Sequence, residues 1–147
     1  MIIYIDTSAL GRVYLGDRSD GTELSRILYE GDRPVITSEL TDVEIASTLA
    51  RATRDGVIDS ITADGLLDRY TADTSDIGPL GVVALDSDTI ALAQRYVRSA
   101  SLRTLDAIHL AACARFGEST PDEICLLSRD QRQNEAAQAL GIALAEG

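Results

Sequence analysis

Four acidic residues stand where predicted strands end or predicted helices begin, far apart along the chain: Asp6, Glu44, Asp106 and Asp130. In a parallel α/β sheet, the carboxyl ends of the strands and the following helix N-termini meet at one edge, where ligands bind. Four carboxylates at that edge would repel one another unless a hard cation neutralised them. The pattern therefore predicts a divalent metal site, for Mg²⁺ or for Mn²⁺.

Each of the four acids also has a purely structural explanation. Asp6 directly follows the apolar residues 2–5 and, like Asp130, is suited to cap a helix. Glu44 lies beside the apolar face of its predicted helix, but a surface ion pair with a nearby arginine explains it equally well. Asp106 opens an otherwise apolar helix, where it either interacts with the helix dipole or requires buried partners. The arrival of four acids at one edge, rather than any single position, favours the metal site.

Other polar residues lie near these acids or near the ends of predicted elements. His109 follows Asp106 by three residues, which places both on one helix face. Imidazole suits Mg²⁺ less well than carboxylate does, so we expect a structural histidine rather than a metal ligand. Asp42 is expected to support a helix dipole, and Asp86 and Asp88 to serve as turn or cap residues.

Short apolar runs alternate with longer periodic stretches, which is typical of α/β proteins. With 147 residues, 45% of them hydrophobic, the chain has the size of one domain and can bury a core. Strands are predicted over residues 2–6, 34–37, 124–128 and 142–145 and within 78–85. Helices are predicted over 9–15, 22–30, 38–54, 61–70, 87–100, 102–116 and 131–140, with a loop over 16–21 and helix stops at Gly117 and Gly141.

The net charge of −11 is unusual for a nucleic-acid binder, which normally carries a basic surface. A metal bound to several acids would remove part of this excess, and an acidic body also suits a basic protein partner. The chain contains no lysine, which excludes Walker-type phosphate loops and other mechanisms that need one. No cluster of cysteine and histidine fits zinc.

The sequence also gives expectations about the compartment. No apolar stretch approaches the roughly 20 residues of a membrane span. The N-terminal apolar run stops at Asp6, and no basic segment precedes it. Cys113 and Cys125 stand in apolar contexts, where we expect reduced thiols. We therefore expect a cytoplasmic protein that does not associate with membranes.

Several segments match the motifs of a known family: residues 3–10, 38–44, 102–111, 127–130, 136–137 and 140–141. On these motifs the chain resembles the PIN-domain ribonucleases, specifically the VapC toxins of type II toxin–antitoxin systems. The match over 102–111 is the most specific, and the similarity spans nearly the whole chain. Ser128 departs from the usual threonine of the last motif but keeps the hydroxyl group.

The resemblance implies a three-layer α/β/α fold with a central parallel sheet of four to five strands, in a single PIN domain over residues 1–147. It implies a Mg²⁺-dependent endoribonuclease, with Mn²⁺ as the alternative ion, that cleaves single-stranded or loop RNA by means of metal-activated water. The acids expected around the cation are Asp6, Glu44, Asp106 and Asp130.

The resemblance also implies supporting residues and partners. Thr7 and Ser128 would orient the metal-binding acids, and three arginines would hold RNA phosphates: Arg12, Arg103 and Arg129. The implied partners are an RNA substrate, a second copy of the chain in a homodimer, and a cognate VapB-like antitoxin.

Three other functions would also place acids at strand ends or use this fold. A receiver-like signalling domain usually needs a lysine, which the chain lacks. A haloacid-dehalogenase-type phosphatase needs a second acid two residues after the first, whereas Ser8 occupies that place after Asp6. A catalytically silent PIN-fold module that acts through protein partners is the third, and the four intact acids argue against it.

Overall fold

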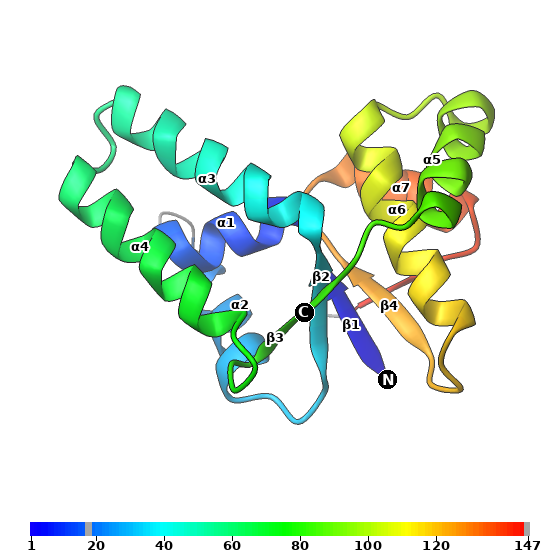
Figure 1. The fold of residues 1–147 in the computed structure, drawn as a ribbon, viewed down its shortest axis with the longest axis horizontal. Helices are drawn as coiled ribbons and strands as arrows, with labels where there is room; N and C mark the ends of the chain where they lie inside the picture. Colours follow the sequence, from blue (N-terminus) through cyan, green and yellow to red (C-terminus); the bar gives the residue numbers. More distant parts are fainter. Residues whose placement is uncertain (17–18, 146–147) are drawn as a thin grey trace.

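The computed structural model describes residues 1–16 and 19–145, which form five strands and seven helices (Figure 1). The strands are β1 (Ile2–Ile5), β2 (Val35–Ser38), β3 (Leu80–Val83), β4 (Ile124–Leu127) and β5 (Ala143–Leu144). The helices are α1 (Thr7–Leu15), α2 (Gly21–Tyr29), α3 (Glu39–Arg54), α4 (Ser60–Asp73), α5 (Ser87–Ala100), α6 (Thr104–Glu118) and α7 (Gln131–Ala139). Each predicted strand and helix is confirmed, with ends that differ by a few residues.

The strands form one parallel sheet in the order β3-β2-β1-β4-β5. Its parallel direction and its five strands confirm the expected sheet. β1 lies at the centre, where Ile3 pairs with Val35 of β2 and Ile5 with Leu127 of β4. Because these strands are parallel and in close register, their carboxyl ends lie side by side. The segments that follow β1, β2 and β4 therefore start at the same edge of the sheet.

Helices cover both faces of the sheet, which gives the three layers (Figure 1). Alternate residues of β1 point to opposite faces. Ile3 and Ile5 pack with residues of α1, α2 and α4, whereas Ile2 and Tyr4 pack with residues of α6 and α7. Burial of one such isoleucine stabilises the fold by about 1.5–3 kcal/mol. The continuous apolar run of β1 is thus explained by burial on both faces.

One predicted helix end is wrong. Gly117 was expected to stop its helix, but α6 continues through it to Glu118. The glycine serves close packing instead, because a Cβ atom at this position would lie 2.7 Å from Cγ2 of Ile124. Gly141, by contrast, does follow the end of α7 and adopts a φ of +78°, a conformation that favours glycine.

Two further expectations concern the first loop and membranes. The loop predicted over 16–21 includes residues 17 and 18, which lie outside the described residues, and α2 begins at its last residue, Gly21. No helix in residues 1–16 or 19–145 is long and apolar enough to cross a membrane.

Candidate active site

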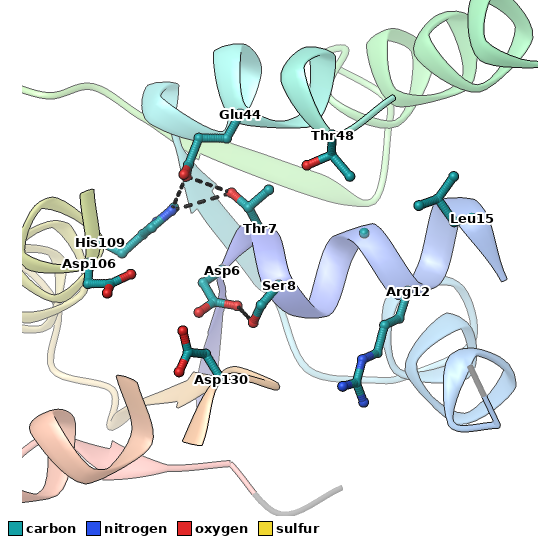
Figure 2. A pocket seen from close by; sticks show the side chains of 11 residues that line it. Asp6, Thr7, Ser8, Arg12, Leu15, Glu44, Thr48, Asp106, His109 and Asp130 are labelled. Carbon is teal, nitrogen blue, oxygen red and sulfur yellow. Dashed lines mark hydrogen bonds and ion pairs between the residues drawn. The ribbon is translucent and has the colours of Figure 1, made fainter. Parts of the chain in front are cut away.

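A pocket lies at the carboxyl edge of the sheet, walled by α1, α3, α6 and the turn before α7 (Figure 2). Its cavity of about 360 Å³ is lined by all four acids singled out from the sequence. They come from four separate segments: Asp6 from the end of β1, Glu44 from α3, Asp106 from α6 and Asp130 from the start of α7. The topology of the sheet therefore brings these distant carboxylates to one cavity.

Asp6 is the most buried of these acids, with 4% of its surface exposed. It caps α1: its Oδ1 atom accepts hydrogen bonds from the Ala9 backbone N–H at 3.2 Å and from the Ser8 hydroxyl at 2.6 Å. Burial nevertheless raises the pKa of Asp6 above its usual value. The side chain thus has the structural role of a cap and also faces the cavity, so the two explanations offered for it do not exclude each other.

Glu44 reaches the pocket from the opposite wall. Its Oε1 atom accepts hydrogen bonds from Thr7 at 2.8 Å and from His109 Nε2 at 2.5 Å, as Figure 2 shows. Burial alone would raise the pKa of Glu44, but the bonds from His109 and Thr7 hold this pKa below its usual value. Among residues 1–16 and 19–145, Glu44 forms no ion pair with an arginine, so the alternative explanation from the sequence does not apply there.

His109 is buried, with 3% of its surface exposed, yet it lines the pocket. Its Nδ1 atom lies 2.8 Å from the hydroxyl of Tyr4, so both ring nitrogens have partners. The sequence suggested a structural histidine and did not predict its contact with Glu44. The one signal was its spacing of three residues from Asp106, which placed both side chains on the pocket face of α6.

Asp106 and Asp130 are joined by one arginine. Arg103 donates from Nε to Asp106 Oδ2 at 2.9 Å and from Nη2 to Asp130 Oδ2 at 3.1 Å. Asp130 also caps α7, since its Oδ1 accepts from the backbone N–H groups of Arg132 and Gln133. Arg103 was expected to hold RNA phosphates, and here its guanidinium lies between two acids instead.

The two hydroxyls expected to orient the acids lie in the right region but make different contacts. Thr7 donates to Glu44 rather than to Asp6, whose hydroxyl donor is Ser8. Ser128 accepts from the Asp130 backbone N–H at 3.1 Å, and its hydroxyl lies 3.2 Å from that of Ser8. The Ser128 side chain also helps to lower the pKa of Asp6 against the larger effect of burial.

The remaining two arginines proposed for phosphate binding share a single acid. Arg12 Nη1 lies 2.9 Å from Asp20 Oδ2, and Arg129 Nε lies 2.5 Å from the same oxygen. Hydrogen bonds from Arg129 and Arg12 hold the pKa of Asp20 below its usual value. Arg12 lines the pocket beside this ion pair, so a basic edge adjoins the acidic cavity.

The carboxylates do not form a ready-made metal cage. Within the described residues, no three Asp, Glu, His or Cys side chains are placed to hold a metal ion together. Two of the acids, Asp106 and Asp130, instead share the guanidinium of Arg103. That guanidinium is 60% exposed and therefore has room to turn toward solvent.

The chemistry of the donor set does fit a hard divalent cation. Glu44 Oε2 and Asp106 Oδ1 accept no hydrogen bond from the part of the chain that the structure describes. Each therefore keeps an oxygen for a ligand, beside the buried carboxylate of Asp6. Carboxylate oxygens of this kind are preferred ligands of Mg²⁺ and Mn²⁺.

The fold and this acidic pocket agree with a family assignment. The family model described as PIN domain matches residues 3–139, and the chain belongs to this family.

Two curated relatives from Mycobacterium tuberculosis strains carry the name Ribonuclease VapC35. Each is 29% identical over 145 residues, which make up 97% of this chain and 95% of the relative. The resemblance to VapC proteins that the motifs suggested thus extends along nearly the whole length.

A solved structure shows the same architecture. Mycobacterium tuberculosis VapC20, described as a sarcin–ricin-loop-cleaving toxin, superposes with a TM-score of 0.68. The alignment covers 99% of both chains at 15% sequence identity. This likeness confirms the three-layer α/β/α fold.

Proposed function

We propose that this protein is the toxin of a type II toxin–antitoxin system, a Mg²⁺-dependent endoribonuclease that hydrolyses single-stranded or loop RNA. The observation that carries the proposal is the convergence of Asp6, Glu44, Asp106 and Asp130 on one cavity of a PIN-family chain. The names of the curated relatives, both VapC ribonucleases, support the same activity.

The four acids are proposed to contribute to metal binding in different ways. Asp6 and Asp106 would be the main direct ligands of the proposed cation, and Glu44 and Asp130 would bind it directly or through water. A bound Mg²⁺ supplies a Lewis acid that stabilises negative charge on the phosphate and lowers the pKa of water. Hydrogen bonds within the protein already hold one oxygen each of Asp6 and Glu44, whereas Asp106 and Asp130 would have to exchange Arg103 for the cation.

The basic edge of the pocket provides a place for the RNA backbone. Arg12 and Arg129 lie side by side around Asp20. One guanidinium group can bind two phosphate oxygens through two parallel hydrogen bonds. These two arginines are therefore proposed to hold phosphates next to the scissile bond. A recessed pocket admits an unpaired strand more readily than a duplex.

The proposed biological setting follows from the VapC resemblance. The partners are a VapB-like antitoxin and a second copy of the chain in a homodimer, and the proposed location is the cytoplasm. The formal charge of −11 favours an antitoxin segment that is basic where it enters the pocket.

Cleavage of a panel of labelled RNAs, with Mg²⁺, with Mn²⁺ and with a chelator, tests this function. We expect cleavage only with metal, leaving 5′-phosphate and 3′-hydroxyl ends, and loss of cleavage in Asp6→Asn. Asp59→Asn is the matched control, because Asp59 also caps a helix with its side chain but lies outside the pocket. Mapping of cut ends on total RNA after brief expression would then identify the target.

The second candidate, a catalytically silent module that binds protein partners, makes the opposite prediction. The contacts of Arg103 with Asp106 and Asp130 are the observation in its favour, since they occupy two of the acids. An absence of cleavage, together with no change in melting temperature on addition of Mg²⁺ or Mn²⁺, would support this module.

A further inference from the structure

A line of hydrogen-bonding side chains runs from the core of the sheet into the pocket and ends at Glu44. Tyr4 of β1 is fully buried, and its hydroxyl lies 2.8 Å from His109 Nδ1. The other ring nitrogen, Nε2, lies 2.5 Å from Glu44 Oε1. Figure 2 shows the imidazole of His109 and the carboxylate of Glu44 pointing toward each other across the pocket wall.

The chemistry of Glu44 fixes the direction of its bond with His109. The carboxylate only accepts hydrogen bonds, so Nε2 of His109 must donate to it. The Tyr4 hydroxyl, which can donate or accept, lies against the other ring nitrogen, Nδ1. In a neutral imidazole with its proton on Nε2, Nδ1 is an acceptor, and the Tyr4 hydroxyl supplies the matching donor.

The arrangement fixes one oxygen of Glu44 and leaves the other open. Oε1 accepts from both His109 and Thr7, whereas Oε2 accepts nothing within the described residues. A glutamate side chain has several rotatable bonds, and holding one oxygen restricts where the second can lie. A histidine that served the core alone would not need its Nε2 at the pocket wall.

We propose that His109, held by Tyr4, is a positioning residue that orients Glu44 for catalysis. The inference rests on the proposed ribonuclease activity and adds two residues that act through Glu44 rather than on substrate. Loss of a group that orients a metal-binding carboxylate typically lowers activity about 10- to 100-fold. The effect is expected on kcat, with little change in the KM for RNA, because both side chains are almost fully buried.

The tautomer of His109 tests the inference without any activity measurement. His109 is the single histidine of the chain, so one set of ring ¹⁵N signals reports on it alone. In the metal-free wild-type protein at neutral pH, we expect a proton on Nε2, the nitrogen that faces Glu44. Tyr4→Phe should shift the Nδ1 signal, because it removes the hydrogen-bond partner of this nitrogen. A ring that carries no proton on Nε2 would overturn the proposal.

Kinetics of three variants test the consequence for cleavage. His109→Leu keeps the volume but removes both ring nitrogens, and we expect kcat to fall about 10- to 100-fold. His109→Gln places an amide donor near the position of Nε2, so most of the rate should return. Tyr4→Phe should lower kcat several-fold. Tyr70→Phe is the control, since it removes a buried phenol that donates to Asp42, away from the pocket.

The outcomes separate this inference from the proposed function. If the wild type cleaves RNA and both His109→Leu and Tyr4→Phe cleave at the same kcat, the positioning role is wrong and the ribonuclease stands. The role is equally wrong if His109→Gln is no better than His109→Leu, or if each loss of kcat only follows a loss of folded protein in thermal melts. If the wild type cleaves none of the RNAs with metal, the proposed function fails and this inference fails with it.

Discussion

The Nε atom of Arg103 lies 2.9 Å from Oδ2 of Asp106, three residues further along at the start of α6. This contact places a fixed positive charge beside an acid that is expected to bind a cation. The guanidinium and a metal ion therefore compete for the same carboxylate. Water screens an exposed ion pair of this type, so it contributes little to stability.

Removal of this arginine is expected to strengthen metal binding. In Arg103→Ala, Asp106 and Asp130 lose their shared partner, and the Kd for Mn²⁺ should fall by up to about five-fold, the scale expected for an exposed ion pair. Calorimetric titration of the RNA-free protein measures this change directly.

Arg132→Ala is the control for Arg103→Ala. Arg132 is a neighbouring exposed arginine whose side chain forms no ion pair with the described residues. If both variants change the Kd equally, general charge and not the contact with Asp106 is responsible. An unchanged or weaker affinity in Arg103→Ala would show that the guanidinium does not compete with the metal.

The buried carboxylate of Asp6 predicts how stability depends on pH in the metal-free protein. Burial raises the pKa of Asp6, so the folded state holds its proton more tightly than the unfolded state does. At a pH above the pKa of Asp6 in the folded protein, the ionised side chain lowers the free energy of unfolding. At a pH below 3.8, the ordinary pKa of this group, Asp6 is protonated in both states and the loss of stability disappears. Asp6→Asn should therefore melt higher than the wild type at pH 7, by about 2–4 °C per kcal/mol.

Thermal melts in chelator between pH 4 and pH 8 measure this effect. The advantage of Asp6→Asn should shrink as the pH falls toward 4. Asp59→Asn should show the opposite sign, because hydrogen bonds from Thr62 hold the pKa of Asp59 below its usual value. An Asp6→Asn variant that melts lower than the wild type at pH 7 would contradict the assignment of a desolvated charge to this site.

A second buried acid, Asp73, lies outside the pocket and links three helices through hydrogen bonds. Asp73 of α4 accepts hydrogen bonds through Oδ2 from Tyr14 of α1 at 2.6 Å and from Tyr29 of α2 at 2.5 Å. Asp73→Ala leaves both hydroxyls without this partner, and we expect a loss of about 2–4 kcal/mol, since bonds to charged groups are worth about 1.5–3 kcal/mol each. Urea unfolding measures it. Asp76→Ala, at an exposed position nearby, should change stability little.

The sheet and its order of elements were predictable because the signals are local. The apolar run of β1 identifies a strand buried on both faces, and Asp86 and Asp130 mark helix starts that the structure confirms as side-chain caps. The meeting of the four acids also followed from the sequence, since parallel strands end at one edge. These conclusions required only the type of each element and the direction of its strands.

The contacts that complete the site were not predictable because they join distant segments. His109 meets Tyr4 over 105 residues and Glu44 over 65, and no local pattern encodes such a register. Arg103 lies three residues before Asp106, so the sequence already made it a possible partner of that acid, but its contact with Asp130, 27 residues away, had no local signal. Which side chains meet across such distant segments depends on the packing angles between helices.

The contact of Gly117 with Ile124 also could not be predicted from the sequence, and it gives a testable prediction. Alanine normally stabilises a helix interior relative to glycine by about 0.5–1 kcal/mol. At Gly117 the new methyl group would lie 2.7 Å from Cγ2 of Ile124. Since overpacking costs about 1–3 kcal/mol, Gly117→Ala should be destabilising by about 1 kcal/mol or more.

Gly65→Ala is the matched comparison for Gly117→Ala. Gly65 lies inside α4, and a Cβ atom there meets nothing within 4 Å, so this variant should gain about 0.5–1 kcal/mol. Urea unfolding of both variants gives the two values under the same conditions. Equal stabilisation of the two would mean that Ile124 moves aside freely, and that the end of α6 is set by helix propensity and not by its contact with β4.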